Sequence, residues 1–276
     1  MGLRRLLARG LGRLALRIDR RALLDGKSMR MMLPPTATRR PAADADPAAD
    51  FFLDGFVHGT FQPGAALDRV VAICNQLHAG EPREGYEWAT KYQGTRDLRP
   101  DVFGYDPAFV DLLFEQGLAP LFDRIAGPLT LGHIQLRQVF PTKRSYMPFH
   151  RDSYVYQDRR AGFMPPGTKL IFYPLCGAAP ADRLTIVPGS PLRMFHDSEV
   201  DAAIGQSVAP VTIQSSDSRY VFFNVSAHHH AVEEHDAAGS IRVIYSFVTP
   251  AQASAGFPGN RALHDEFASR LRAAGG

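Results

Sequence analysis

Apolar residues in the second half of the chain fall into short runs that are rich in β-branched and aromatic side chains. Clusters of Gly, Pro and Ser separate these runs, a pattern that predicts strands joined by turns. Several short strands in succession, with no helical pattern between them, are typical of a β-sandwich or jelly roll. The sequence therefore predicts a mainly β core. The expected strands cover residues 129–140, 169–175, 183–187, 208–213, 219–225 and 241–248.

Other parts of the chain have apolar residues at the spacing of an amphipathic helix. This spacing predicts helices over 64–78 and 107–126, ahead of the expected strands, and over 261–273 near the C-terminal end. The folded domain is expected to begin at Phe51 and to cover residues 51–276. We therefore expect a β core with helices flanking it on its N-terminal and C-terminal sides.

The first 33 residues form a separate region in this prediction. Leucines and one isoleucine recur at helical spacing in residues 1–21 and arginines occupy the remaining surface, which predicts a basic amphipathic helix. Such a helix either lies in the plane of an anionic membrane surface or packs its leucine stripe on the protein's own core. Arginines interrupt every apolar run, so we expect neither a transmembrane helix nor a secretory signal peptide. Residues 34–50 are rich in Pro and Ala and are predicted to be a linker.

Composition and charge narrow the class of protein. Hydrophobic residues make up 45% of the chain and charged residues 21%, as in ordinary globular proteins. Residues 1–40 hold eleven of the 31 Lys and Arg but only two of the 28 Asp and Glu, so the predicted domain is acidic and nucleic-acid binding by it is not indicated. Cys74 and Cys176 match no metal or redox spacing, which favours reduced thiols and a cytoplasmic protein. Residues 1–21 leave association with the cytoplasmic face of a membrane open.

A His-x-Asp triplet, His150-Arg151-Asp152, follows the strand expected at 129–140. In an extended backbone, residues i and i+2 project to one side, so one imidazole and one carboxylate can hold the same ion. The triplet alone has little weight, because a chain with 10 His and 28 acidic residues is expected to contain one by chance. A second triplet, His264-Asp265-Glu266, lies in the helix expected at 261–273, where positions i and i+2 do not share a face. We assign no metal to that triplet.

Three consecutive histidines, His228-His229-His230, lie further along the chain and are candidates for a second nitrogen ligand. Two His and one carboxylate on one side of an iron leave three positions open, the arrangement of non-haem Fe(II) oxygenases. Oxygen and a co-substrate need such open positions. The sequence therefore indicates a candidate iron site rather than a closed structural metal site.

Arg242 lies in the otherwise apolar run 241–248 and is a candidate for binding an acidic co-substrate. A buried arginine requires an anionic partner, and a guanidinium can hold the distal carboxylate of 2-oxoglutarate by two parallel hydrogen bonds. Ser246, four residues further on, faces the same side of a strand and could support that carboxylate. The alternative is an edge-strand arginine that points to solvent.

Together these residues resemble the phytanoyl-CoA dioxygenase family of Fe(II)/2-oxoglutarate oxygenases. The resemblance implies a double-stranded β-helix, a jelly-roll and cupin-like core, in which His150, Asp152 and His230 hold Fe(II). It also implies that Arg242, with help from Ser246, holds 2-oxoglutarate, and that O2 is the other co-substrate. The similarity extends from about Phe51 to Thr249 and includes Asp54 to Val57, Phe149 to Asp152, Ile186 to Ser190, His230, Arg242 and Ser246.

Among the three histidines, the separation from Arg242 and the Ala-Val pair that follows favour His230 as the second nitrogen ligand. Alternation along a strand also allows His228, and His229 is the third alternative. A carboxylate ligand at Asp152 argues for hydroxylation, because related halogenases vacate that position for chloride. The resemblance therefore implies a hydroxylase that releases succinate and CO2.

The substrate is expected to be a small molecule, free or linked to a lipid or glycan, and the sequence specifies neither its identity nor an oligomeric state. Tyr154 and Tyr156, just past Asp152, are candidate substrate contacts, with simple packing as the alternative. Lys169, at the beginning of the next expected strand, is a candidate contact for either the substrate or 2-oxoglutarate. Two other functions stay open: a catalytically silent jelly roll that binds a metal or ligand, and a cupin-type metalloenzyme that does not use 2-oxoglutarate.

Overall fold

The computed structural model of the chain describes most of the predicted domain. The predicted N-terminal helix, residues 34–45 of the predicted linker, Tyr154, Tyr156 and Cys176 lie outside the described residues. Within the described part of the chain, no helix is both long enough and apolar enough to cross a membrane. The described residues are 46–92, 94–140, 150–152, 167–175, 181–192, 210–215, 219–231, 240–250, 253 and 260–275.

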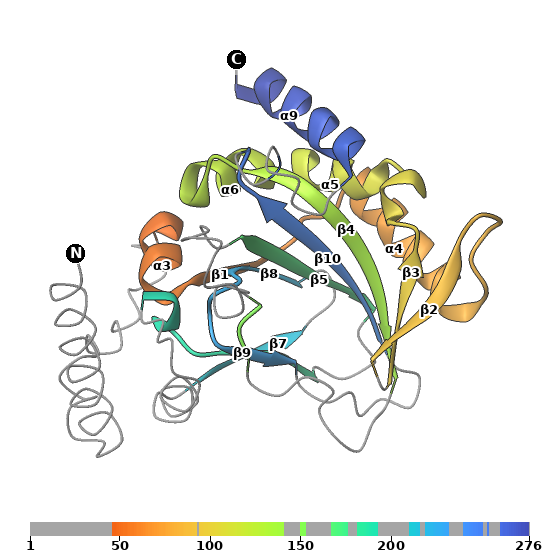
Figure 1. Cartoon of the computed structure of the whole chain (residues 1–276), viewed down its shortest axis with the longest axis horizontal. Coiled ribbons are helices and arrows are strands. Elements are labelled where there is room, and N and C mark those ends of the chain that lie inside the picture. Colours follow the sequence, from red (N-terminus) through yellow and green to blue (C-terminus); the bar gives the residue numbers. More distant parts are fainter. Residues whose placement is uncertain are drawn as a thin grey trace, which may run out of the picture.

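Two antiparallel sheets form the core of the fold (Figure 1). The larger sheet has seven strands in the order β1-β8-β5-β10-β4-β3-β2, and the smaller has three in the order β7-β6-β9. This arrangement confirms the predicted mainly β, jelly-roll core with flanking helices. The strands are β1 Phe56–Thr60, β2 Glu87–Tyr92, β3 Thr95–Arg99, β4 Thr130–Val139, β5 Thr168–Leu175, β6 Ala181–Ile186, β7 Val211–Ser215, β8 Arg219–Asn224, β9 His229–Ala231 and β10 Ser240–Val248.

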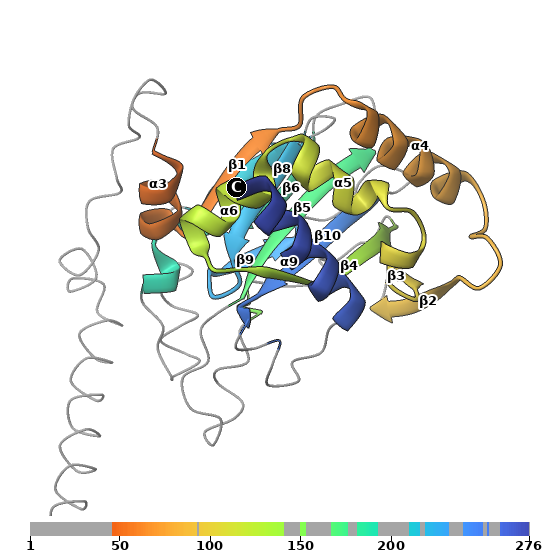
Figure 2. The same cartoon turned by 90° about the horizontal axis from the view of Figure 1, so that it is seen from above.

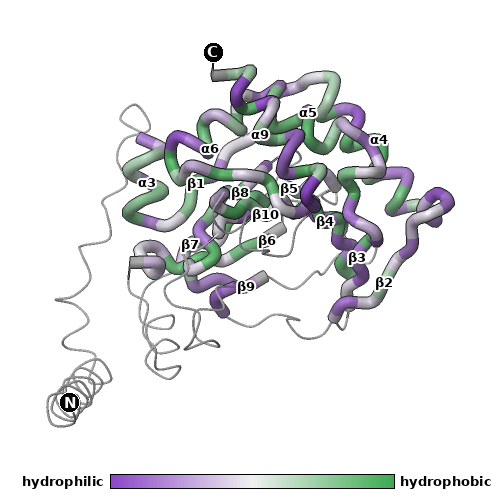
Figure 3. Tube along the Cα trace, turned by 45° about the horizontal axis from the view of Figure 1, so that its top comes forward, coloured by the Kyte–Doolittle hydropathy of each residue, from purple (hydrophilic) through white to green (hydrophobic). Residues whose placement is uncertain are grey.

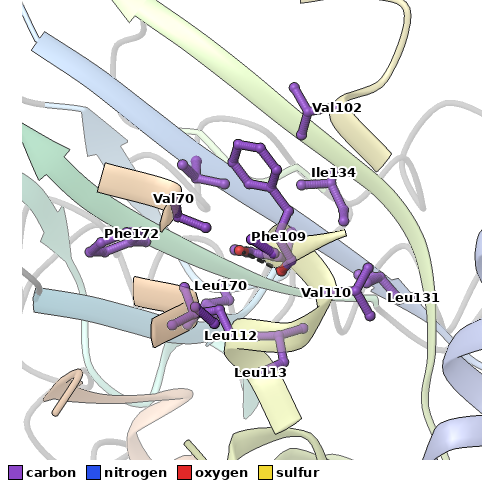
Figure 4. Close-up of a cluster of buried hydrophobic side chains, with 14 of the residues drawn as sticks. Val70, Val102, Phe109, Val110, Leu112, Leu113, Leu131, Ile134, Leu170 and Phe172 are labelled. Atoms are coloured by element: carbon purple, nitrogen blue, oxygen red, sulfur yellow. Dashed lines mark hydrogen bonds between the residues drawn. The ribbon is translucent and has the colours of Figure 1, made fainter. Parts of the chain in front are cut away.

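Helices cover the outer face of the larger sheet, the face turned away from β6, β7 and β9 (Figures 1 and 2). In Figure 4, side chains of α4 and α5 pack against side chains of β4 and β5. The hydroxyl of Tyr245 in β10 donates to the carbonyl of Phe109 in α5 at 2.9 Å, so the one buried polar atom of that tyrosine is satisfied. The helices are α3 Pro47–Asp54, α4 Ala65–Ala79, α5 Ala108–Glu115, α6 Leu118–Ala126 and α9 Arg261–Gly275, with short 3-10 turns η2 Val102–Gly104 and η4 Ser190–Leu192.

Strand β10 contributes side chains to two clusters of buried hydrophobic residues, one on each face of the larger sheet. Ile241, Val243 and Tyr245 belong to the core between the sheet and the helices, whereas Ile244 belongs to the cluster between the two sheets. This follows from the alternation of side chains along a strand. Even-numbered positions of β10 therefore face the space between the sheets, which we call the inner face. The edge strands β2 and β9 are largely hydrophilic, as Figure 3 shows.

The observed elements differ from the predicted ones at two helices and at four strands, β1, β2, β3 and β9, which were not predicted. The helix predicted over 107–126 is two helices, because Gly117 between them has a left-handed backbone with φ of 66°, which interrupts the helical hydrogen bonds. Helix α3 begins at Pro47, within the predicted linker. The side chain of Asp46 caps it by accepting from the backbone N–H of Ala48 at 3.0 Å, and Pro47 occupies the first turn, where no helical N–H is needed.

Candidate metal centre

Backbone pairing brings His150 and Asp152 to the end of β8 and the beginning of β9. His150 and His229 exchange two backbone hydrogen bonds, of 2.9 and 3.0 Å. Two residues on, the N–H of Asp152 donates to the carbonyl of Val225 at 2.9 Å. On its other side, β9 pairs with β6, where His229 lies opposite Ile186. The triplet is therefore fixed by main-chain contacts to β9 of the smaller sheet and to Val225, the residue that follows β8 of the larger sheet.

His150, Asp152 and His229 form a group that could hold a metal ion, with one ligand atom from each lying within 4.8 Å of the others. His150 Nε2 lies 3.3 Å from one carboxylate oxygen of Asp152, and His229 Nε2 lies 3.5 Å from the other. Nδ1 of His229 lies 2.8 Å from the carbonyl of Ala227, which suits an Nδ1–H donor and leaves the Nε2 lone pair facing the group. The arrangement offers two imidazole nitrogens and one carboxylate oxygen to a single ion.

The histidine that joins this group is His229, whereas the sequence favoured His230, so we take His229 forward as the proposed second nitrogen ligand. Residues directly opposite each other in a hydrogen-bonded antiparallel pair project to the same side, so pairing places the His229 side chain beside that of His150. His228 and His230 are its neighbours in an extended chain and project to the opposite side. The separation from Arg242, which favoured His230, carries no information about which strand residue pairs with His150.

Charge and burial in the group favour an ionised Asp152 carboxylate and a neutral His229 imidazole. Burial opposes ionisation of Asp152, but the Lys169 ammonium at 2.9 Å is the strongest influence in the other direction, and the pKa of Asp152 is held well below its ordinary value. Burial also lowers the pKa of His229, although the Asp152 carboxylate acts in the opposite direction. Both directions give the protonation states that a divalent metal requires of its ligands.

Arg242, Ser246 and Lys169 all lie on the inner face of the larger sheet. Arg242 is 2% exposed, which excludes the alternative of an arginine pointing to solvent, and its guanidinium carbon lies 5.7 Å from the ring centre of Tyr173. Ser246 in β10 and Lys169 in β5 are directly opposite each other in the pairing of the two strands. The inner face thus carries positive charge at both ends of β10, and the Lys169 end adjoins the metal-ligand group.

Two charged residues near Arg242 were missed by the sequence analysis. Arg137 in β4 lies directly opposite Arg242 in β10, and Asp97 in β3 lies directly opposite Arg137. Nε and Nη2 of Arg137 donate to the two carboxylate oxygens of Asp97 at 2.7 and 3.1 Å, and both residues are buried. Polar and apolar residues are interspersed in the run 134–139 around Arg137, so nothing in that run singles Arg137 out, unlike Arg242 in its apolar run.

The remaining candidates have separate outcomes. Tyr154 and Tyr156 lie outside the described residues, so their role as substrate contacts stays a prediction. The second triplet, His264-Asp265-Glu266, lies on helix α9 as expected. It contributes to no metal-ligand group among the described residues.

Comparison with solved structures gives matches with the same fold. AviO1 from Streptomyces viridochromogenes Tue57 is 23% identical, with a TM-score of 0.54 over 78% of this chain and 98% of AviO1. The carbocyclase SnoK from nogalamycin biosynthesis, described as non-haem and α-ketoglutarate dependent, is 15% identical, with a TM-score of 0.56 over 82% of this chain and 95% of SnoK. EvdMO1 is 21% identical with a TM-score of 0.54 over 74% of this chain, but the match spans only 49% of EvdMO1.

The likeness establishes the fold. Identities this low do not establish a shared activity. No protein-family model matches the chain, and no curated protein sequence matches it.

Proposed function

We propose that the protein is an Fe(II)- and 2-oxoglutarate-dependent oxygenase that hydroxylates a small-molecule substrate, using O2 and releasing succinate and CO2. The observation that carries the proposal is the group of His150, Asp152 and His229 inside a jelly-roll fold. Two imidazoles and one carboxylate on one side of an iron leave three positions for the co-substrates. The α-ketoglutarate dependence of SnoK, which has this fold, supports the same class.

The three side chains fit an iron ion in spacing and in charge. Metal–ligand bonds to imidazole and carboxylate are about 2.0–2.2 Å long, so ligand atoms around one ion lie up to roughly 4.4 Å apart. The ligand atoms here lie within 4.8 Å of one another, a difference that small side-chain rotations can remove. His229 presents Nε2 because its Nδ1 faces the Ala227 carbonyl, and Asp152 is ionised. When bound, the iron would supply the activation of O2, which no side chain can perform.

Arg242 is the proposed residue for the distal carboxylate of 2-oxoglutarate. It is buried on the inner face of β10, where a guanidinium has the geometry to hold a carboxylate by two hydrogen bonds. Ser246 shares this face and is proposed to assist. Lys169, opposite Ser246, already contacts Asp152, so we propose that it keeps this carboxylate ionised and adds positive charge for the co-substrate. Tyr154 and Tyr156 remain proposed substrate contacts.

The decisive experiment is metal and co-substrate binding to purified protein under anaerobic conditions. Wild-type protein should bind Fe(II) and then develop the visible charge-transfer absorption of an Fe(II)·2-oxoglutarate complex. His229→Ala should lose this absorption, whereas the adjacent His230→Ala is the matched control and should keep it. Absence of the absorption in the wild type would refute the proposal.

Arg242 separates the proposed oxygenase from a metalloenzyme that does not use 2-oxoglutarate. Arg242→Ala should weaken 2-oxoglutarate binding strongly while metal binding persists, because Arg242 is not one of the proposed ligands. A screen of succinate release over a metabolite panel, with Fe(II) and ascorbate present, would then identify the substrate. Unchanged 2-oxoglutarate affinity in Arg242→Ala would overturn the role given to that residue.

A further inference from the structure

The middle residue of the triplet, Arg151, connects three separate segments of the chain. Its Nη1 donates to the backbone carbonyl of Ser190, at the beginning of η4, at 3.0 Å. The same nitrogen donates to the backbone carbonyl of Ser226, in the segment that leads into the histidine run. Ser190 and Ser226 are 1% and 0% exposed, so both carbonyls lie in the protein interior. Arg151 therefore satisfies two interior acceptors while His150 and Asp152 on either side of it join the ligand group.

Ser190 makes the second part of the connection through its hydroxyl group. The hydroxyl donates to the carbonyl of Val187 at 2.6 Å and accepts from the backbone N–H of His228 at 2.8 Å. The carbonyl of His228 in turn accepts from the N–H of Val187 at 2.9 Å. Both main-chain groups of the residue immediately before His229 are thus held by the segment 187–190.

The segment 187–190 is itself anchored to the frame of the domain. The N–H of Gly189, which has a left-handed φ of 72°, donates to the carbonyl of Asp54 at 3.0 Å. Pro191 packs against Gly55 at the end of α3 so closely that a Cβ on this glycine would lie 2.4 Å from the proline ring. The segment is therefore tied to α3 as well as to the histidine run and can act as a fixed reference point.

We propose that Arg151 and Ser190 are positioning residues that together set the distance between the His150–Asp152 pair and His229. We call them the Arg151–Ser190 clamp. The inference rests on the proposed function, because it takes these three side chains as the metal ligands. Neither clamp residue belongs to the ligand group; each acts through the main chain of the ligand segments.

The physical basis is the precision that a metal site demands. Ligand atoms must be held within a few tenths of an ångström, and here they come from segments that are distant in sequence. The guanidinium suits this task because it presents several donors in a rigid plane, whereas a lysine ammonium is a flexible point donor of the same charge. Arg151→Lys therefore keeps the charge near the metal and removes the fixed geometry. Ser190→Ala removes a single oxygen atom and with it the link to His228.

The test is the affinity of metal-free protein for Co(II), measured by titration calorimetry, together with the melting temperature of the metal-free variants. Arg151→Lys and Ser190→Ala should each weaken Co(II) binding about 10- to 100-fold, the usual range for residues that orient metal ligands. Arg69→Lys is the matched control. Arg69 donates to the Asp106 carboxylate at the surface. The Arg69→Lys variant should therefore bind Co(II) as tightly as the wild type does. The double variant should lose less than the two single losses combined, because both residues serve the same connection.

The outcomes separate the clamp from the proposed function. If the wild type fails to bind Co(II), or His229→Ala binds it equally well, the ligand assignment fails and the clamp with it. If the wild type binds, His229→Ala does not, and both folded clamp variants stay within twofold of the wild type, only the clamp is refuted. Should Arg151→Lys fail to fold, Ser190→Ala decides alone, since it removes one buried hydroxyl and no charge.

Discussion

The buried ion pair between Asp97 and Arg137 gives a sharp prediction about stability. Hydrogen bonds of 2.7 and 3.1 Å join the two residues. The side chain of Asp97 is only 4% exposed and that of Arg137 only 10%. Asp97→Asn removes the negative charge that faces the guanidinium and replaces one acceptor by a donor. Removing one partner of a buried pair costs about 3–5 kcal/mol, so we expect the free energy of unfolding to fall by roughly that amount.

The loss in the free energy of unfolding should be smaller for a surface ion pair and for a variant in which both buried charges are replaced. Arg69 also donates to a carboxylate, that of Asp106, but its side chain is 62% exposed, so Arg69→Ala should cost less than about 1 kcal/mol. Asp97→Leu combined with Arg137→Met removes both charges and should cost clearly less than Asp97→Asn alone, because well-packed apolar residues often replace a buried pair without loss.

Urea unfolding followed by circular dichroism measures these differences directly. A loss below about 1 kcal/mol for Asp97→Asn would refute the reasoning, since it would mean that this pair contributes no more than a typical exposed one. A double variant less stable than Asp97→Asn would refute it in a second way, by showing that shape and not charge determines the cost.

Three further predictions concern the helical layer, a buried thiol and the N-terminal region. Phe122→Ala should lower the free energy of unfolding by about 3–5 kcal/mol, because Phe122 is fully buried and its ring stacks on that of Phe222 with centroids 3.9 Å apart; a loss near zero would contradict that packing. Burial raises the pKa of the Cys74 thiol, so in a Cys176→Ser background it should resist a thiol reagent at pH 8 and react only after unfolding; rapid reaction of the native protein would be the contrary result. Deletion of residues 1–30 should abolish binding to anionic liposomes, whereas unchanged partitioning would remove the membrane interpretation.

The pattern of the sequence was informative where a strand is buried on both faces. The strands at 129–140, 169–175 and 241–248 became β4, β5 and β10, because they form the middle of the larger sheet and contain runs of buried apolar residues. β1, β2, β3 and β9 were missed. The residues of β2 at the sheet edge are mostly exposed or half-buried and carry little hydrophobic signal.

The candidate site was predictable in composition but not in register. His150 and Asp152 were identified because their spacing has a local geometric meaning. The choice among the three histidines depends on which of them pairs with His150. The spacing of residues within one segment does not determine how that segment pairs with a distant one. Arg137 and Asp97 were missed for a similar reason: each is unremarkable in its own strand, and only the neighbouring strands bring them together.

The alternation along β10 has a consequence for how this protein can be altered. Its odd-numbered residues pack against the helices, whereas Ile244 lies between Arg242 and Ser246 on the inner face. Substitutions at position 244 therefore change the shape of the space between the two proposed co-substrate residues while the helical layer keeps its contacts. One face of β10 thus maintains the packing of the fold, and the other lines the proposed site. Ile244 is therefore the first position at which to redesign which molecules the site accepts.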